Sequence, residues 1–521
     1  MRRVRLWLVL VLVLSSHPAT APVLGKPLQG KINALLSSKR IKSDQVGMLI
    51  VDLNTHETLA GVNPTRAMIP ASNLKLVTTA AALGVLGPDF VFQTRLRVIH
   101  PADWPDDADL GEGATPYRKS VVIVVQGDGD PAFVDPVLME RYGYGQDVRD
   151  IEQFLQLWVR AIQRTGVKRV SRVFVDDRVF DRKFVHPTWP INQLNSWYSA
   201  QVAGFNFYDN CIEVFASPAA HVGQSPSIRI SPIMPFLRTS NNALTGATDT
   251  FWINRQPNSN RLIYAGNVKN ERTKPVLITM HDPPMLFAEI LKDRLESVGI
   301  EVEGFGRPDE GQQLPQGRII HIVQTDLPTV ITRCNKQSQN LYAEALIKRM
   351  GRHITGAPGS WETGAAAVRQ FLQKKLGTRA SAIRIADGSG LSRDNRISAD
   401  AMVELLSAMH DDPTLGPIFL QSLAIGGRDG TLAKRFRHTP LEGVVHAKTG
   451  YINRVSTLSG YYILPAEKDT QEHVVAFSFL FNNFKPPVHV HNVKQLQEDL
   501  VGLIDDYIES SRERATASAG G

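Results

Sequence analysis

Three short motifs that could share one site stand far apart in this chain of 521 residues. They are Ser72–Lys75 (SNLK), Ser338–Asn340 (SQN) and Lys448–Gly450 (KTG). A compact domain that held all three would need far fewer residues than the stretch 76–337 between the first and the second. The spacing therefore predicts that at least one further module is inserted there, and the chain length allows about two to four domains.

The first motif predicts a nucleophile at the start of a helix. Ser72 follows Pro70 by two residues and precedes LKLVTTAAALGVLG, whose apolar residues recur at helical spacing until Gly87. Free N–H groups and the helix dipole at such a position favour negative charge on the serine and on an oxyanion beside it. Lys75 faces the same side one turn later and can accept the hydroxyl proton if its pKa is lowered. A serine with a lysine base is typical of acyl transfer.

The other two motifs gain meaning from their context, because each alone also fits a turn, a capped helix or a solvated surface. The KTG ends VVHAKTG and precedes VSTLSGYYIL and HVVAFSFLFN, which read as successive strands, so we expect Lys448 on a sheet edge. The SQN lies between the helical stretches LPTVITRCNK and LYAEALIKRMG, where a short turn can place Ser338 and Asn340 in a cleft. A second SxN, Ser240–Asn242, lies in a polar, loop-like run, and we assign it no role.

In this order the motifs resemble those of the penicillin-recognising serine acyltransferases, which include D,D-peptidases, transpeptidases and serine β-lactamases. The stretches NKQSQNLYAEALIKRMG, IADGSGLSRDNRISA, LAIGGRDGTLAKRF and HAKTGYINRVSTLSGYY resemble the low-molecular-mass class C penicillin-binding proteins. These form the D-alanyl-D-alanine carboxypeptidase/endopeptidase family, peptidase S13. The similarity also covers GDGDP at 127–131, FVDDRVF at 174–180 and AEILKDRLESVGIEVEG at 288–304, and so extends over nearly the whole chain.

The resemblance implies an α/β (α+β) fold whose catalytic domain is β-lactamase/penicillin-binding-protein-like, an antiparallel sheet flanked by helices. Residue patterns agree with this architecture. Residues 46–62 read as a strand hairpin, three strands follow one another in 442–482, and Val493–Ile508 keeps the apolar spacing of a helix. We therefore expect a discontinuous catalytic domain, residues 27–92 and 322–510.

The region between these two parts, residues 93–321, reads as strand-rich. Six short extended runs are separated by Pro, Gly, Asn and Ser clusters, and one helix is expected at 284–298. The resemblance implies that this accessory region contains two modules. Residues 511–521 are expected to form a flexible tail.

The resemblance also implies roles in cleaving a D-alanyl-D-alanine peptide bond of peptidoglycan. Ser72 attacks the carbonyl, Lys75 accepts its proton, and Ser338 relays a proton to the leaving amine in the positive potential of Lys448. Asn340 binds the substrate amide. The substrate carboxylate is held at Lys448–Gly450, chiefly by Lys448 and Thr449. The oxyanion hole uses the backbone N–H groups of Ser72 and Tyr451. A β-lactam would undergo the same acylation and stall.

Two positions depart from this pattern or extend it. Tyr451 stands where the family commonly has a small hydroxyl residue, so a free C-terminal carboxylate would be bound less well and cross-link cleavage tolerated better. In this family a carboxylate from the inserted region approaches the motif lysine; Asp176 is the first candidate and Asp177 the second. Either could equally cap a strand or a turn.

The N-terminus reads as a signal peptide, with a basic start, an apolar run at 6–14 and a small-residue cleavage site near 21. We expect an exported, periplasmic or cell-envelope protein. Loss of Arg2, Arg3 and Arg5 with the signal peptide lowers the formal charge from +7 to +4, and this mild basic excess could favour an anionic wall polymer or membrane surface. Cys211 and Cys334 permit one disulfide or two separate buried thiols. No nucleic-acid or metal-binding motif is evident, and serine acyl transfer requires no metal or other cofactor.

Two other functions fit parts of the pattern. A β-lactamase or esterase could use the same machinery, but no residue suggests a dedicated deacylation base. A catalytically weak wall-binding protein would not need the complete set of Ser72, Lys75, Ser338, Asn340 and Lys448. The sequence therefore predicts a serine D,D-peptidase, without indicating its oligomeric state.

Overall fold

The computed structural model describes residues 27–104, 120–144, 148–466 and 471–519. The expected signal peptide, residues 1–21, lies outside the described residues. Within the described part of the chain, no helix is both long and apolar enough to span a membrane.

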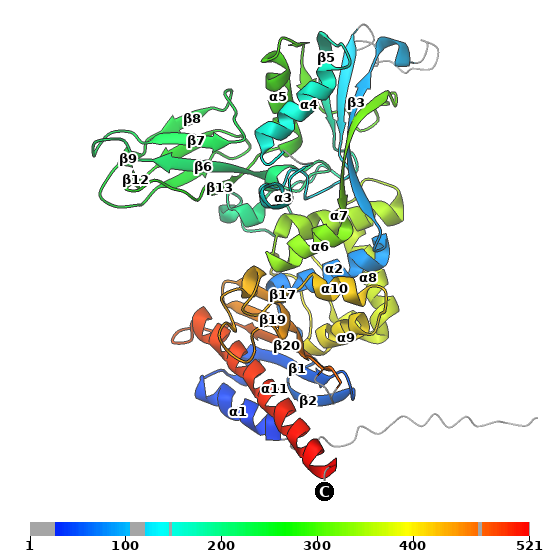
Figure 1. The fold of residues 1–521 in the computed structure, drawn as a ribbon, viewed down its shortest axis with the longest axis vertical. Coiled ribbons are helices and arrows are strands. Elements are labelled where there is room, and N and C mark those ends of the chain that lie inside the picture. Colours follow the sequence, from blue (N-terminus) through cyan, green and yellow to red (C-terminus); the bar gives the residue numbers. More distant parts are fainter. Residues whose placement is uncertain (1–26, 105–119, 145–147, 467–470, 520–521) are drawn as a thin grey trace, which may run out of the picture.

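One six-stranded sheet is built from both ends of the chain (Figure 1). The N-terminal hairpin supplies two strands, and its first strand pairs antiparallel with the last strand of the chain, Val46 opposite Phe481. In spatial order the strands are β17 (Ala424–Ile425), β18 (Val445–Ile452), β19 (Val455–Leu464), β20 (His473–Asn482), β1 (Val46–Asp52) and β2 (Glu57–Val62). The hairpin and the three C-terminal strands are therefore confirmed.

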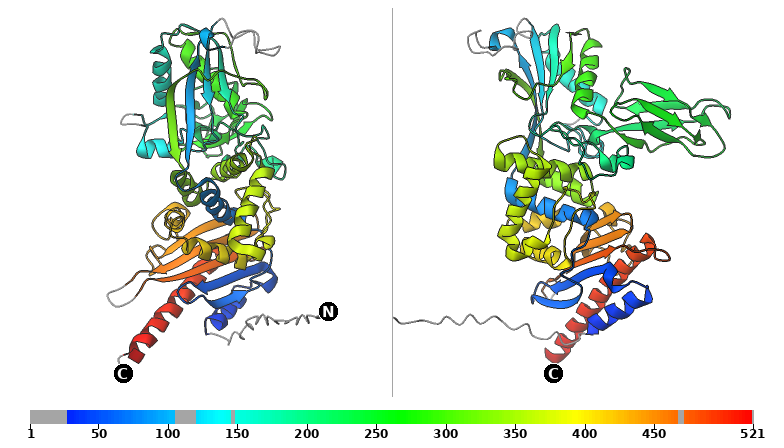
Figure 2. Two further views of the ribbon diagram at one scale, coloured as in Figure 1. Left: turned by 90° about the vertical axis from the view of Figure 1, so that its right-hand side faces the viewer. Right: turned by 180° about the vertical axis from the view of Figure 1, so that it is seen from behind.

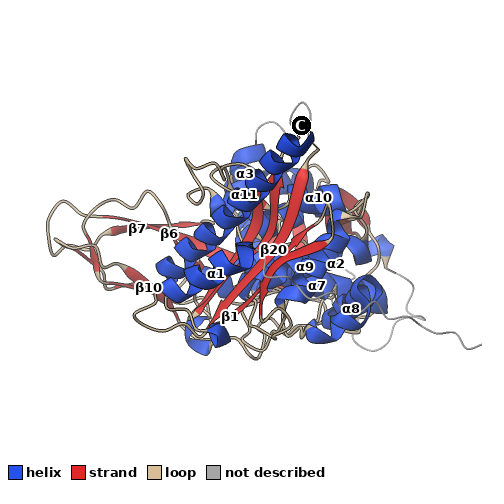
Figure 3. Cartoon of the chain, turned by 90° about the horizontal axis from the view of Figure 1, so that it is seen from below, coloured by secondary structure: helices blue, strands red, loops and turns tan. Residues whose placement is uncertain are grey.

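Helices cover both faces of this sheet (Figure 3). On one face, α1 (Pro27–Ser38) and α11 (Val490–Ala519) share an apolar core with β1 and β20. On the other lie α2 (Leu74–Leu86), α6 (Leu327–Lys336), α7 (Asn340–Thr355), α8 (Trp361–Leu376), α9 (Ala399–His410) and α10 (Gly416–Gln421). This is the expected antiparallel sheet flanked by helices.

The C-terminal helix is longer than the sequence pattern indicated. The expected flexible tail began at residue 511, but α11 continues through Ala519. Ser511 Oγ donates to the Tyr507 carbonyl and Arg512 donates to the Gln471 carbonyl, so the first residues of the extension are anchored. Glu, Arg and Ala in this stretch are good helix formers even without an apolar stripe.

Two paired strands connect this layered body to the region between the first two motifs. β3 (Val91–Ile99) leaves α2, and β16 (Arg318–Asp326) returns to α6, antiparallel, with Val91 opposite Asp326. They belong to a second sheet with β4 (Val121–Gln126), β5 (Arg169–Asp176), β14 (Glu301–Val302) and β15 (Phe305–Gly306). The helices α4 (Ile151–Gln163) and α5 (Pro283–Glu296) share its apolar core.

Residues 211–279 form three small sheets that project to one side (Figures 1 and 2). Their strands are β6 (Cys211–Ser217), β7 (Ser227–Ser231), β8 (Thr239–Asn241), β9 (Leu244–Thr245), β10 (Trp252–Arg255), β11 (Leu262–Ala265), β12 (Asn267–Val268) and β13 (Val276–Thr279). Cys211 begins β6 and Cys334 lies in α6, each a separate buried thiol.

The inserted region contains more helix than the sequence analysis expected. The one helix expected there, at 284–298, is confirmed as α5, and the region has two more, α3 (Pro136–Tyr142) and α4. The Asp150 side chain caps α4 by accepting from the Gln153 N–H, and the apolar residues Ile151, Phe154 and Trp158 face the core. α4 is an ordinary amphipathic helix, but the strand-like sequence on either side of it made its helical pattern easy to overlook.

Candidate active site

Ser72 lies in the 3₁₀ turn η2 (Ala71–Asn73), which leads directly into α2. The turn is clamped to the sheet by Asn73, whose Nδ2 donates to Ser459 Oγ (2.6 Å) and whose Oδ1 accepts from Thr457 Oγ1 (2.8 Å). The Thr457 hydroxyl also lies 2.9 Å from the Pro70 carbonyl oxygen. Sequence reasoning assigned no role to Asn73, although it occupies the second position of the motif.

Lys75 reaches Ser72 as the helical spacing predicted. Its Nζ lies 3.0 Å from Ser72 Oγ, 2.6 Å from Asn340 Oδ1 and 2.9 Å from the Ser389 carbonyl oxygen. The side chain is completely buried. Burial lowers the pKa of Lys75 to about 8, against the opposing attraction of Glu344 and Asp387. A lysine with this pKa is partly neutral near pH 7 and can accept a proton from the serine.

Lys448 makes the corresponding contact with the second motif. From β18 its Nζ donates to Ser338 Oγ (2.8 Å) and to the Thr449 carbonyl (2.8 Å). β17 pairs with β18 only at His446 and Ala447, so Lys448 lies where β18 becomes the sheet edge, as expected. Ser338 has a φ of +60°, a conformation imposed by the tight connection between α6 and α7. Burial, and then the charge of Lys75, lower the pKa of Lys448 well below its usual value.

The remaining predicted residues surround these two pairs. Asn340 begins α7 and uses Oδ1 for Lys75, while its Nδ2 donates to the Tyr198 carbonyl (2.7 Å). Thr449 Oγ1 donates to Thr431 Oγ1 (2.9 Å). Tyr451 is 53% exposed, and its ring lies 6.0 Å from Lys494 Nζ.

Gly450 is required where β18 passes the nucleophile turn. A Cβ at this position would lie 2.2 Å from Thr457 Oγ1 and 3.0 Å from the Pro70 carbonyl oxygen. Only glycine lets the two backbones approach this closely. The close approach keeps the β18 backbone beside Ser72.

Two buried carboxylates near Lys75 were not predicted. Glu344 accepts from the N–H groups of Gly388 (2.9 Å) and Ser389 (2.8 Å) and from Trp361 Nε1 (2.7 Å). Burial raises its pKa to about 7. Asp387 is also fully buried. Their sequence context offered a clue, because Asp387 in IADGSGLS and Glu344 in LYAEAL are acids among apolar residues, and a buried acid needs dedicated hydrogen-bond partners.

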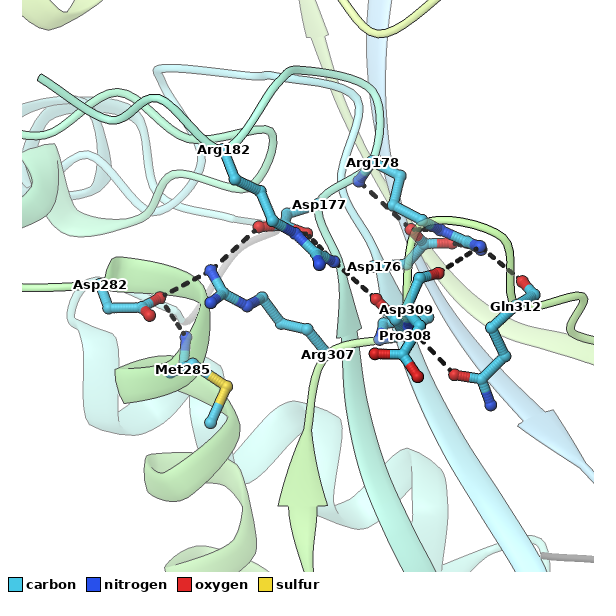
Figure 4. Close-up of polar contacts among 10 residues, drawn as sticks. All are labelled: Asp176, Asp177, Arg178, Arg182, Asp282, Met285, Arg307, Pro308, Asp309 and Gln312. Carbon is cyan, nitrogen blue, oxygen red and sulfur yellow. Dashed lines mark hydrogen bonds and ion pairs between the residues drawn. The ribbon is translucent and has the colours of Figure 1, made fainter. Parts of the chain in front are cut away.

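The expectation that Asp176 approaches Lys75 is wrong. Asp176 ends β5, and both of its carboxylate oxygens accept from Arg178, at 2.8 Å each (Figure 4). Asp177 instead contacts Arg182 (3.1 Å) and Arg307 (3.4 Å). An arginine two residues away binds Asp176 bidentately and holds it in the inserted region. The carboxylates that act on Lys75 are Glu344 and Asp387.

The second SxN motif lies apart from this site. Ser240 belongs to β8 of the small sheets, and its Oγ lies 3.5 Å from Asn242 Oδ1. Among the described residues there is no cluster of three or more His, Cys, Asp or Glu side chains that could hold a metal ion.

The model of the family "D-Ala-D-Ala carboxypeptidase 3 (S13)" matches residues 28–505 of this chain. The chain belongs to this family. As an S13 enzyme it is a serine-type D-Ala-D-Ala carboxypeptidase/endopeptidase with the penicillin-binding-protein fold. This separates it from the β-lactamase and the weak wall-binding alternatives.

Individual relatives agree with this S13 assignment. The chain is 30% identical over 502 residues to the D-alanyl-D-alanine carboxypeptidase of Actinomadura sp. (strain R39). The alignment covers 91% of this chain and 85% of that protein. Its fold is similar to the crystal structure of penicillin-binding protein 4 from Haemophilus influenzae, with a TM-score of 0.71, 21% identity, and coverage of 91% and 99%. A second structure of that protein, complexed with a β-lactam, matches with a TM-score of 0.66 at the same identity and coverage.

Proposed function

We propose that this S13 enzyme is exported to the cell envelope and forms its acyl-enzyme on Ser72. The observation that carries this assignment is the 3.0 Å contact between Ser72 Oγ and the buried amine of Lys75. A hydroxyl becomes a competent nucleophile when a base of suitable pKa lies within hydrogen-bonding distance.

Acylation follows from the two lysine–serine pairs. Neutral Lys75 accepts the Ser72 proton as Ser72 Oγ bonds to the D-alanyl carbonyl carbon, and the oxyanion lies against the N–H groups of Ser72 and Tyr451. The peptide C–N bond then breaks. The proton passes from Lys75 to the leaving amine through the Ser338 hydroxyl, which Lys448 orients from 2.8 Å. Water then hydrolyses the ester and restores Ser72.

Substrate contacts lie on the β18 side of the site. Lys448 and Thr449 hold the substrate carboxylate, where an ammonium and a hydroxyl give charge-assisted hydrogen bonds. Asn340 contacts the substrate amide through the second N–H of Nδ2, because its Oδ1 and first N–H serve Lys75 and Tyr198. Gly450 allows this strand to lie against the nucleophile turn.

A β-lactam carries out only the first half of this sequence. Its strained amide acylates Ser72, but the amine remains tethered and blocks the water. The β-lactam complex of the Haemophilus influenzae protein supports extending this behaviour to the present enzyme. Peptidoglycan stem peptides are the corresponding substrates.

We assign the catalytic domain to residues 27–92 and 322–510, with the continuation of α11 to Ala519, and the two accessory modules to 93–321. Export rests on the N-terminal signal-like segment, residues 1–21. Peripheral association with the wall or membrane surface would follow from the excess of basic residues.

The product of the reaction tests this proposal. Purified cross-linked and uncross-linked muropeptides are incubated with the enzyme and with Ser72→Ala, and products are identified by mass. Released D-alanine shows carboxypeptidase activity, and opened cross-links show endopeptidase activity. If the wild type forms neither product, the proposed activity is refuted. If Ser72→Ala forms as much product as the wild type, the assignment of Ser72 is refuted.

A further inference from the structure

A segment of the inserted region leaves its own sheet and lies on the catalytic helices. After β5, Asp181 accepts from Lys348 Nζ of α7 (2.7 Å), and the Lys183 carbonyl accepts from the same amine (2.6 Å). The Asp181 N–H donates to the Gly359 carbonyl (3.0 Å). The chain then continues along the catalytic helices through residues 184–202, which we call the buttress segment.

Trp189 is the main contact of the buttress segment with the catalytic domain. Its indole is 4% exposed, and Nε1 donates to Asp387 Oδ2 (2.9 Å). The ring also packs edge-on against Trp361 of α8, with centroids 5.9 Å apart. The adjacent Thr188 donates from Oγ1 to Ser392 Oγ (2.6 Å). Both residues therefore contact one short loop, residues 387–392.

This loop is the part of the backbone that binds the lysine base. Asp387 holds it in shape by accepting from the N–H groups of Gly390 (2.9 Å) and Ser392 (2.6 Å). The loop in turn presents the Ser389 carbonyl to Lys75 Nζ at 2.9 Å. A Cβ on Gly390 would lie 1.8 Å from the Ala71 carbonyl oxygen, so the loop packs directly against the nucleophile turn.

A second contact of the buttress segment acts on Asn340. The Tyr198 carbonyl can only accept, so it orients the Asn340 amide with Nδ2 toward itself. This leaves Oδ1 directed at Lys75 Nζ, 2.6 Å away. Two of the three polar contacts of Lys75, to Ser389 and to Asn340, are thus supported by residues 184–202.

We propose that the buttress segment positions Lys75, with Trp189 acting through Asp387 and the Ser389 carbonyl, and Tyr198 acting through the Asn340 amide. The proposal rests on the assignment of Lys75 as the base. The inserted region would then contribute to catalysis, because residues 184–202 complete the surroundings of Lys75 in the catalytic domain. Trp189 is a positioning residue, since it touches neither substrate nor nucleophile.

Removal of the indole N–H is expected to loosen the loop and withdraw the Ser389 carbonyl from Lys75. The charged amine then has one acceptor fewer, so its pKa falls further, while its alignment with Ser72 worsens. The charged and titratable groups facing Lys75 from the other elements are Cys334 and Glu344 from the helices, Asp387 from the loop and Lys448 from β18. The substitution replaces none of these groups, and of their contacts it removes the hydrogen bond that Trp189 donates to Asp387.

The test compares penicillin acylation of Trp189→Phe with that of the wild type across a range of pH around 8. We expect the acylation rate constant to fall about 10- to 100-fold, as is usual when a reacting group is misplaced. We also expect the acid limb of the profile to move to lower pH. A purely structural role would reduce stability without moving that limb, and an unchanged profile would overturn the proposal.

Two further variants keep this test decisive. Trp252→Phe in β10, outside the buttress segment, alters a 52% exposed ring and should behave as wild type. If Trp189→Phe does not fold, an indole analogue with sulfur in place of the ring N–H, incorporated at position 189, preserves the packing and removes only the donor. Wild-type acylation kinetics with this analogue would overturn the proposal. Failure of the wild type itself to be acylated would refute the proposed function instead.

Discussion

Lys448 Nζ lies 2.8 Å from Ser338 Oγ, so the third motif donates a hydrogen bond directly to the second. The amine is completely buried and, with Lys75, places two lysines around one site. Their mutual repulsion contributes to the lowered pKa of Lys448. Ser338 can therefore exchange protons readily with its surroundings, as the relay to the leaving amine requires.

Replacement of Lys448 by methionine should impair acylation strongly while leaving the fold intact. The methionine retains the buried apolar stem but cannot orient Ser338. We expect the acylation rate constant to fall about 100-fold or more, in the range usual for loss of a proton-transfer group. Stopped-flow measurement with a chromogenic penicillin checks this, and a loss of less than about threefold, which is roughly 0.65 kcal/mol in the activation barrier, would contradict the relay.

The pH dependence of acylation should report the state of Lys75. The base is active when neutral, so the rate should rise as pH increases through about 8 and decline below it. Glu344→Gln removes a carboxylate that raises the pKa of Lys75, and the acid limb should move to lower pH. Pre-steady-state acylation over this pH range measures both effects. A limb that moves to higher pH in Glu344→Gln would contradict the account.

Gly450→Ala should destabilise the protein and reduce acylation. The new methyl group would meet Thr457 Oγ1 and the Pro70 carbonyl, and such overpacking typically costs about 1–3 kcal/mol. Gly502→Ala in α11 is a matched control, because a Cβ added at position 502 would have no neighbour within 4 Å outside its own helix backbone. Denaturant titration of both variants should show a loss in the first and no loss in the second. Equal stability of the two would show that the close approach at Gly450 is unimportant.

Tyr451→Thr should shift the enzyme toward carboxypeptidase activity. Tyr451 is more than half exposed beside the expected carboxylate site, and a threonine would supply the small hydroxyl that is missing there. We expect the ratio of released D-alanine to opened cross-links to increase about tenfold, the effect of one charge-assisted hydrogen bond of roughly 1.4 kcal/mol. Chromatography of muropeptide digests measures the ratio. An unchanged ratio would show that residue 451 does not select the substrate.

The parts of the fold that depend on local pattern were predictable from the sequence. The helix after Ser72 and the strands around Lys448 follow from the period of their apolar residues. α4 had an equally good signal in Asp150, Phe154 and Trp158, but it stood among many short strands and was missed. The helical continuation past residue 511 lacks an apolar stripe, so periodicity could not indicate it.

The surroundings of Lys75 could not be predicted because they depend on tertiary contacts. The Ser389 carbonyl is a backbone atom, and no residue type identifies it. Glu344 is separated from Lys75 by the whole inserted region. Asp176 was a reasonable candidate by resemblance, but its bidentate contact with Arg178 directs it elsewhere.

Covalent labelling of Ser72 tests the central claim most directly. The enzyme is treated with a fluorescent penicillin, digested, and the labelled peptide is identified by mass spectrometry, with Ser72→Ala as the control. The account predicts one adduct, on the peptide that contains Ser72, and none in Ser72→Ala. A label on another residue, or a label that persists in Ser72→Ala, would contradict it.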